Sequence, residues 1–333
     1  MYFSRKILMV SLLCIYASCN ADAQRGGLSL DYYIETCPSV EEIVRSETER
    51  IMSIAPTLAA PLLRLHFHDC FVRVSSYDIG CDGSVLLNST KNSKAEKDSP
   101  PNFTLRGYGS IERVKAAVEE KCPGVVSCAD IVALVARDAV SILKGPYWKV
   151  PLGRRDGRIS NASEALANIP APTFNFTQLK ASFAVKGLTS KDLVVLSGSH
   201  TIGTSHCSTI ATRLYNFSGT GAPDPSMDPE YVARLKSRCR PTDNTTLVEM
   251  DPGSFRTFDL HYYENVGKRR GLFTSDSTLL SDGLAGSYVR RQGSLATAAE
   301  FFEDFSDSMV KLGSIGVLTG KEGEIRKRCD AVN

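Results

Sequence analysis

Residues 64–70 read Arg-Leu-His-Phe-His-Asp-Cys, and residues 197–201 read Ser-Gly-Ser-His-Thr. Side chains four positions apart share one face of a helix, whereas side chains two positions apart do not. If the first stretch is helical, Arg64 and His68 therefore project into the same space and His66 points elsewhere. A permanent cation beside an imidazole suits acid–base catalysis on a small oxygen-containing substrate. The lone histidine of the second stretch is a candidate to hold a metal cofactor on the opposite side of that space.

The N-terminus has the features of an export signal. Arg5 and Lys6 precede an apolar run, residues 7–17, that is too short to span a bilayer, and a cleavage site of small residues follows. We therefore predict a signal peptide at residues 1–23 and a mature, exported chain at 24–333. No other long apolar segment follows, and the formal net charge is only +2. We expect neither a membrane nor a nucleic acid as a partner.

The cysteine count agrees with export. Of ten cysteines, two fall in the predicted signal peptide, and the even number that remains is typical of a complete disulfide set in an exported protein. Eight cysteines permit about 105 pairings. Zinc binding is the alternative use, and the absence of any Cys-x-x-Cys pair disfavours it. Export also predicts N-glycosylation, for which the chain has six sequons, at Asn88, Asn102, Asn161, Asn175, Asn216 and Asn244.

Helical periodicity dominates the mature chain, and β-type alternation is scarce. The pattern predicts an all-α fold of ten or more helices, with long loops at 91–109 and 145–172. The sequence Thr-Ser-Lys-Asp at 189–192 is typical of a helix start. The predicted helices are 40–54, 57–71, 111–121, 128–143, 177–186, 190–197, 229–237, 258–268 and 295–312.

Taken together, the motifs of the chain resemble those of the plant secretory (class III) peroxidases, the haem enzymes of plant cell walls. The ordered blocks that carry the resemblance extend over nearly the whole mature chain, at 63–71, 126–130, 151–156, 196–203 and 258–259. The resemblance implies a two-lobed all-α fold in which one haem b lies between a distal and a proximal lobe. It implies a secreted monomer of the cell wall that uses hydrogen peroxide to oxidise phenolic donors by one-electron steps.

The resemblance also implies roles for five residues around the haem. His68 is the proton acceptor and general acid–base, and Arg64 stabilises the charge that builds as the O–O bond breaks. Asn102, backed by Glu96, keeps His68 neutral and oriented. His200 is the axial ligand of the haem iron. Without the resemblance, Arg64 and His68 would be an ordinary polar pair and His200 an ordinary core histidine.

Two further residues complete the predicted haem surroundings. Asp276 matches the carboxylate that makes an axial histidine a stronger donor, although alone it would be an ordinary surface acid. Pro170, in Pro-Ala-Pro at 170–172, matches the loop at the haem edge where a phenol docks on a backbone carbonyl. An ordinary proline-rich turn is the alternative for that loop.

The resemblance further implies two calcium ions and four disulfides. One ion flanks each catalytic histidine, and oxygen ligands are what calcium prefers. The predicted ligands of the first ion are Asp69, Val72, Gly80, Asp82 and Ser84. The predicted ligands of the second are Thr201, Asp251, Ser254, Thr257 and Asp259. The implied disulfides are Cys37–Cys122, Cys70–Cys81, Cys128–Cys329 and Cys207–Cys239.

One segment departs from the family pattern. Seven residues, 73–79, separate Val72 from Gly80, where one is usual. The six additional residues fall inside both the first calcium loop and the Cys70–Cys81 ring, so the chain departs from the family pattern at both of these features.

The residues alone leave two alternative functions open. The insertion favours a catalytically impaired haem-binding or wall-binding protein, which the retention of the distal and proximal residues argues against. A zinc hydrolase that uses His66 and His68 is disfavoured, because positions two apart on a helix direct their side chains apart.

Overall fold

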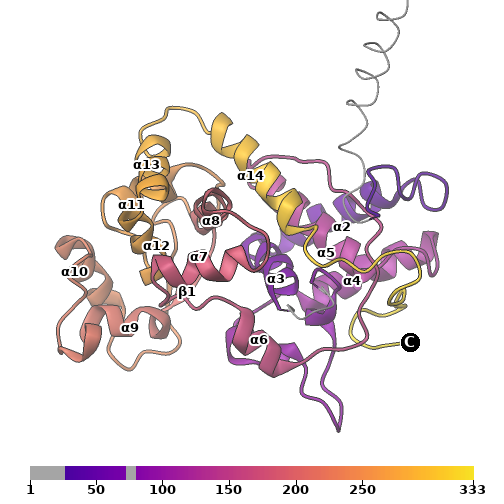
Figure 1. The fold of residues 1–333 in the computed structure, drawn as a ribbon, viewed down its shortest axis with the longest axis horizontal. Helices are drawn as coiled ribbons and strands as arrows, with labels where there is room; N and C mark the ends of the chain where they lie inside the picture. Colours follow the sequence, from indigo (N-terminus) through magenta and orange to yellow (C-terminus); the bar gives the residue numbers. More distant parts are fainter. Residues whose placement is uncertain (1–26, 73–79) are drawn as a thin grey trace, which may run out of the picture.

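The structure is a computed structural model that describes residues 27–72 and 80–333; the predicted signal peptide and the inserted residues 73–79 lie outside the described part. The described chain is mainly helical (Figure 1). Its helices are α2 (Val40–Ile54), α3 (Ala59–Phe71), α4 (Tyr108–Lys121), α5 (Cys128–Ile142), α6 (Ala162–Asn168), α7 (Phe176–Ala184), α8 (Ser190–Ser197), α9 (Cys207–Tyr215), α10 (Pro229–Arg238), α11 (His261–Gly267), α12 (Thr274–Ser277), α13 (Gly283–Gln292) and α14 (Ala299–Leu312). The strands β1 (Thr204–His206) and β2 (Leu247–Glu249) pair antiparallel, with Ser205 opposite Val248.

The all-α prediction is confirmed, and each predicted helix is present with ends that differ from the predicted ones by at most four residues. Helices α2 and α8 begin and end at the predicted residues. Helices α6, α9, α12 and α13 were not predicted, and α6 lies within the segment 145–172 that we expected to be a loop. Helix α13 illustrates why a helix can be missed in the sequence. It contains Gly283 and Gly286, which disfavour a helix, and the main local feature that favours one is the Asp282 side chain, which caps its start.

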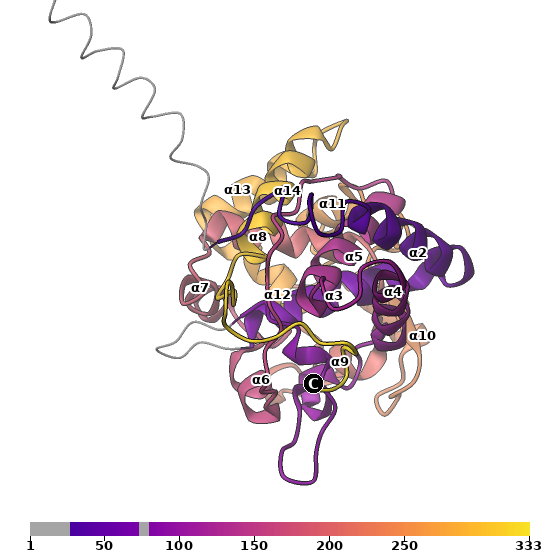
Figure 2. The ribbon, with the colours of Figure 1, turned by 90° about the vertical axis from the view of Figure 1, so that its right-hand side faces the viewer.

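Helix α3, which carries the 64–70 motif, lies in the middle of the molecule. In both views it has α5 on one side and α7 on the other (Figures 1 and 2). Phe71 at its end contacts Phe183 of α7, with ring centroids 5.0 Å apart. Helices α3, α5, α7 and α8 all contribute to one hydrophobic core. The motif is therefore held by packing on several sides.

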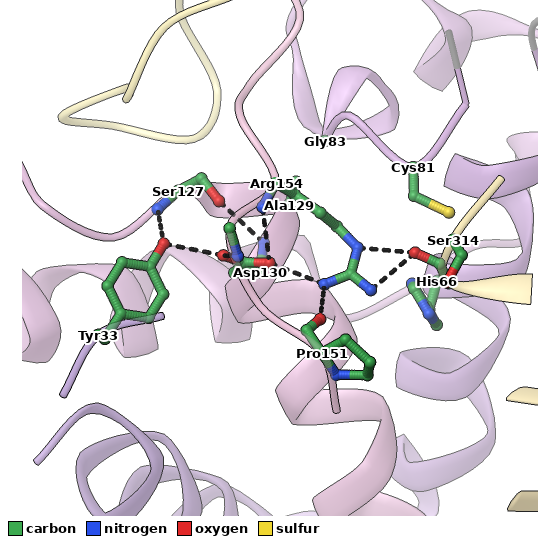
Figure 3. A network of polar contacts seen from close by, with 12 residues as sticks. Tyr33, His66, Cys81, Gly83, Ser127, Ala129, Asp130, Pro151, Arg154 and Ser314 are labelled. Atoms are coloured by element: carbon green, nitrogen blue, oxygen red, sulfur yellow. Dashed lines mark hydrogen bonds and ion pairs between the residues drawn. The ribbon is translucent and has the colours of Figure 1, made fainter. Parts of the chain in front are cut away.

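A buried polar network lies beside His66 of α3 (Figure 3). Asp130 of α5 accepts hydrogen bonds from the Tyr33 hydroxyl at 2.8 Å and from Arg154 Nη1 at 2.7 Å. Arg154 in turn donates from Nε and Nη2 to the carbonyl oxygen of Gly313. Burial and the nearby Arg154 cation lower the pKa of His66 to about 3, so His66 is neutral. This environment fits the structural role that the sequence predicts for His66.

All four implied disulfides are formed. They are Cys37–Cys122, Cys70–Cys81, Cys128–Cys329 and Cys207–Cys239. The Cys70–Cys81 bridge, whose ring contains the inserted residues, is therefore present as the family resemblance implies. A hydrogen bond of 2.6 Å from Gly80 N to Gly316 O fixes the chain directly after the insertion.

No helix in the described residues is both long and apolar enough to cross a membrane.

Candidate active site

Arg64 and His68 lie one turn apart on α3, as the spacing predicts. His68 is buried, and its Nδ1 lies 2.5 Å from the side-chain oxygen of Asn102. Because an amide oxygen only accepts hydrogen bonds, His68 carries its proton on Nδ1 and presents a free lone pair on Nε2. Burial and the Arg64 cation lower the pKa of His68 well below its ordinary value, which outweighs the bond to Asn102. The imidazole is therefore a neutral base.

The orientation of Asn102 is fixed from its other end. Its Nδ2 donates to the main-chain oxygen of Glu96 at 2.8 Å. Glu96 therefore backs Asn102 through its backbone, while its carboxyl group is buried. Burial, with the negative charges of nearby aspartates, raises the pKa of Glu96 well above its ordinary value.

Arg64 is anchored on the same loop that carries Asn102. Its Nη1 donates to Thr104 Oγ1 and its Nη2 donates to the Pro101 carbonyl oxygen, each at 2.9 Å. Burial lowers the pKa of Arg64 to about 10, so the guanidinium remains charged near neutral pH. Sequence reasoning missed both Thr104 and Pro101, because nothing in their spacing links them to a helix 40 positions earlier.

His200 lies in a 3₁₀ turn, Gly198–Thr201, that continues directly from α8. Its Nδ1 lies 2.7 Å from Asp276 Oδ1, and this pair confirms the proximity that the motifs predict. Asp276 is buried and also accepts from the Tyr262 hydroxyl at 3.0 Å and from Phe273 N at 2.8 Å. Burial opposes ionisation of Asp276, but His200 and these hydrogen bonds outweigh it and lower its pKa. Asp276 is thus a carboxylate.

The surroundings of His200 fit an axial ligand of haem iron. With Nδ1 committed to Asp276, the nitrogen left for a metal is Nε2, and the side chain is 36% exposed although its carboxylate partner is buried. The rings of Tyr262 and Phe273 contact the imidazole edge-on, with centroids 5.8 and 5.3 Å away. Close packing also requires Gly198, since a Cβ there would lie 2.5 Å from the Tyr263 hydroxyl. The imidazole is therefore held in one orientation.

The side-chain ligands predicted for the first calcium ion come together near the end of α3. Asp69 accepts from Gly83 N at 2.9 Å, and Asp82 accepts from Ser84 N at 3.0 Å. Burial and the Asp82 charge raise the pKa of Asp69 to about 8. A buried cluster in which the charge of one carboxylate raises the pKa of its neighbour is an environment that a divalent cation would stabilise. Val72 and Gly80 lie at the two ends of the inserted segment.

The residues predicted for the second calcium ion also form one cluster, beside His200. Thr201 Oγ1 lies 3.3 Å from Asp251 Oδ2 and 3.1 Å from Asp259 Oδ1. Ser254 Oγ donates to Asp259 Oδ2 at 2.6 Å, and Thr257 N donates to Ser254 O at 2.7 Å. Burial and the Asp259 charge raise the pKa of Asp251 to about 7. These oxygen donors fit a hard divalent cation.

Two neighbours of the second cluster were not predicted. His261 and the two aspartates place one ligand atom each within 4.8 Å of one another. Asn265 Nδ2 donates to Asp251 Oδ1 at 3.0 Å. Both residues belong to α11, whose start the periodicity places three residues too early.

The Pro-Ala-Pro loop follows α6 and is connected to the segment that carries Asp276. Pro172 O accepts from Ser275 N at 3.0 Å. Pro170 itself is half-buried, next to the buried Ile169, which packs with Val72 at the end of α3. The loop therefore contacts segments from both the distal and the proximal sides.

Comparisons with known proteins agree with this geometry. Residues 44–294 match the family model described as Peroxidase. The chain is 57% identical to Peroxidase 1 of Oryza sativa subsp. japonica, over 99% of each chain. It is 58% identical to Peroxidase 1 of Arabidopsis thaliana over 91% of each chain, and 52% identical to Peroxidase 27 of Arabidopsis thaliana over 99% of each.

Proposed function

This chain belongs to the plant (class III) peroxidase family and is a haem peroxidase that uses hydrogen peroxide; we propose that His68, Arg64 and Asn102 perform its acid–base chemistry and that His200 and Asp276 hold its one haem b. The observation that carries the proposal is the different partner of each histidine. A neutral amide oxygen accepts from His68, and a carboxylate accepts from His200. The first partner favours a neutral acid–base, and the second favours an electron-rich metal ligand.

The haem and the protein have separate tasks in this reaction. When bound, haem supplies the two-electron reduction of hydrogen peroxide and the two one-electron oxidations of the donor. Overall, one hydrogen peroxide and two phenolic donors give two oxidised donors and two waters. The side chains hold the haem, move one proton and stabilise charge.

The proton is moved by His68. Its Nε2 takes the proton from one oxygen of hydrogen peroxide and delivers it to the other, which leaves as water. Arg64 stabilises the negative charge on the departing oxygen, since with a pKa of about 10 its guanidinium stays charged near neutral pH. Asn102 keeps the His68 proton on Nδ1, so Nε2 is free for each transfer.

The phenolic donor is proposed to bind at the Pro-Ala-Pro loop. The carbonyl oxygen of Pro170 would accept a hydrogen bond from the phenol hydroxyl. The proposal is supported by the rigidity of a proline-rich loop that is fixed to Ser275 through Pro172 O.

We propose one calcium ion in each of the two oxygen-rich clusters, where it would hold the distal or the proximal histidine segment in place. The first set comprises Asp69, Val72, Gly80, Asp82 and Ser84. The second comprises Thr201, Asp251, Ser254, Thr257 and Asp259. We propose that the mature chain, 24–333, is secreted to the cell wall as an N-glycosylated monomer; the four disulfides support its export.

A single preparation tests these assignments. The purified protein should contain one iron and two calcium ions per chain, show the absorption spectrum of a histidine-bound haem, and oxidise a simple phenol with hydrogen peroxide. His200→Ala should lose haem. A protein that binds haem but oxidises no phenol would instead support the impaired, binding-only alternative.

A further inference from the structure

The short loop Pro100–Thr104 contacts both distal catalytic side chains. Asn102 accepts from His68 at 2.5 Å, and Thr104 accepts from Arg64 at 2.9 Å. The two acceptors are only two positions apart in the chain. The loop therefore fixes the acid–base and the cation relative to each other, and any movement of the loop would move both.

The direction of the Arg64 guanidinium depends on few contacts. Across residues 27–72 and 80–333, no carboxylate forms an ion pair with Arg64, and its hydrogen bonds go to two neutral acceptors. One acceptor is the Pro101 main-chain oxygen, which is present whatever the side chain. The other is the Thr104 hydroxyl, which a single substitution removes. Thr104 is thus the side chain that sets the rotation of the guanidinium about its Nη2 contact.

We propose that Thr104 is a positioning residue for Arg64 in the peroxide reaction. This inference rests on the proposed role of Arg64 and extends it to a residue that never contacts the substrate. Stabilisation of a developing charge depends on donors that are already aimed at it, and displacements of about 1 Å have large kinetic cost. Without the hydroxyl, the guanidinium would sample several rotations and stabilise the departing oxygen less well.

A structural role for Thr104 is disfavoured by its location. The residue is exposed, and its side chain is not part of the hydrophobic core. Replacement by valine, which has the same shape, should therefore leave the fold intact. By contrast, Thr48 is fully buried in α2, where its hydroxyl donates to Val44 O at 2.7 Å. Thr48→Val removes a threonine hydroxyl on α2, a helix that carries none of the proposed site residues, and is the control.

The test compares Thr104→Val, Thr104→Ser and Thr48→Val with the unmodified haem-loaded protein. All four are made in a host without N-glycosylation, because Thr104→Val also removes the sequon at Asn102. Rapid mixing measures the second-order rate of reaction with hydrogen peroxide and, separately, the rate of donor oxidation. Crystal structures of the two Thr104 variants locate the guanidinium of Arg64.

We expect Thr104→Val to slow the peroxide step by about three- to tenfold, less than the 10²–10³-fold cost of deleting a charge-stabilising donor. Donor oxidation and the melting temperature should not change, and the crystal structure should show Arg64 rotated or in several conformers. Thr104→Ser should restore the peroxide rate, and Thr48→Val should leave it unchanged.

The inference would be overturned if Thr104→Val reacts with hydrogen peroxide at a rate within 1.5-fold of the unmodified protein. It would also be overturned if the rates of the peroxide reaction and of donor oxidation fall by the same factor. Arg64→Leu separates this failure from failure of the proposed function. If Arg64→Leu is slow while Thr104→Val is not, Arg64 acts as proposed without help from Thr104. If Arg64→Leu reacts at the normal rate, the proposed role of Arg64 is itself wrong.

Discussion

At the scale of single residues, the two functional histidines differ mainly in what their Nδ1 contacts. His68 donates to a neutral amide, and His200 donates to a carboxylate that two further hydrogen bonds keep ionised. The same imidazole is thereby a neutral proton carrier in one place and a strong metal ligand in the other.

The carboxylate partner leads to a prediction about redox potential. Asp276→Asn should leave haem bound but raise the ferric/ferrous midpoint potential, because His200 becomes a weaker donor and stabilises the ferric state less. Asp138 is also a buried aspartate, but it lies on α5. Asp138→Asn should leave the midpoint potential unchanged. Spectroelectrochemistry that finds an unchanged or lowered midpoint in Asp276→Asn would contradict the role of the carboxylate.

Asn102 leads to a prediction about glycosylation. Both ends of its amide are committed, to His68 and to Glu96 O, and the Thr104 hydroxyl of the same sequon accepts from Arg64. A glycan on Asn102 Nδ2 is incompatible with these bonds in a buried side chain. We expect this sequon to be unoccupied in active protein while at least one of the other five carries a glycan. Glycopeptide mass spectrometry that finds a sugar on Asn102 in active enzyme would rule out the His68 contact.

The sequence predicts the residues of the site better than their contacts. Arg64 and His68 follow from helix periodicity, and His200 follows from a family motif. Thr104 and Tyr262 have no such signal, because their contacts depend on how distant segments pack. Glu96 is a further example. The family motif predicts that this residue supports Asn102, but only the structure shows that its main-chain oxygen makes the contact.

At the scale of elements, the position of His200 depends on α8. The helix starts with a capping box in which Asp192 Oδ2 accepts from Thr189 N at 2.9 Å, while Thr189 Oγ1 accepts from Asp192 N. Asp192 Oδ1 also accepts from Ser308 Oγ and Lys311 Nζ of α14, each at 2.9 Å. One buried carboxylate thus sets the start of α8 and joins it to α14.

This carboxylate should make stability depend on pH. Burial opposes ionisation of Asp192, but hydrogen bonds from Thr189, Lys311 and Ser308 outweigh it and lower its pKa to about 2. The contribution of the ionised Asp192 to the free energy of unfolding is therefore fully present above its pKa in the unfolded chain, which is about 3.9. This contribution is lost as the pH falls through its folded-state pKa of about 2. Asp192→Asn should lower the free energy of unfolding by about 1–2 kcal/mol at pH 6 and by only a few tenths near pH 2.

Denaturant unfolding at the two pH values, with the disulfides intact, measures this difference. Asp307→Asn, an exposed aspartate on α14, is the control and should have little effect at either pH. An equal loss for Asp192→Asn at both pH values would show that its charge contributes nothing.

The inserted residues 73–79 lead to a second element-scale prediction. Asp69 and Asp82, on either side of the insertion, lie in one cluster, and the Cys70–Cys81 bridge is closed. We therefore expect a variant that lacks six of these seven residues to bind the same two calcium ions with the same stabilisation against heat. Calorimetric titration of both forms measures this. Tighter binding to one site in the shortened form would show that the insertion weakens the distal site.

At the scale of the whole molecule, long-range covalent and polar links join the segments that carry the site. The Cys128–Cys329 bridge connects α5 to the C-terminal segment. The Asp130–Arg154–Gly313 network (Figure 3) connects α5 to the residue that follows α14. Helix α5, which these links hold, packs closely against α3 with its Arg64 and His68. Sequence patterns predict the long helices and, through the family, the disulfide pairs. The short helices α6, α9, α12 and α13 were not predicted; α12 spans only four residues, and α13 contains two glycines, which disfavour helix.

The most direct test of the central claim, that His68 is the acid–base of a haem peroxidase, is the rate at which hydrogen peroxide reacts with the haem-loaded protein. His68→Ala should slow this rate by about 10²–10⁴-fold, the usual contribution of general acid–base catalysis. His66→Gln, two positions away on the same helix but within the Arg154 network, should react at close to the normal rate with an unchanged haem spectrum. A His68→Ala rate within tenfold of the unmodified protein would contradict the account.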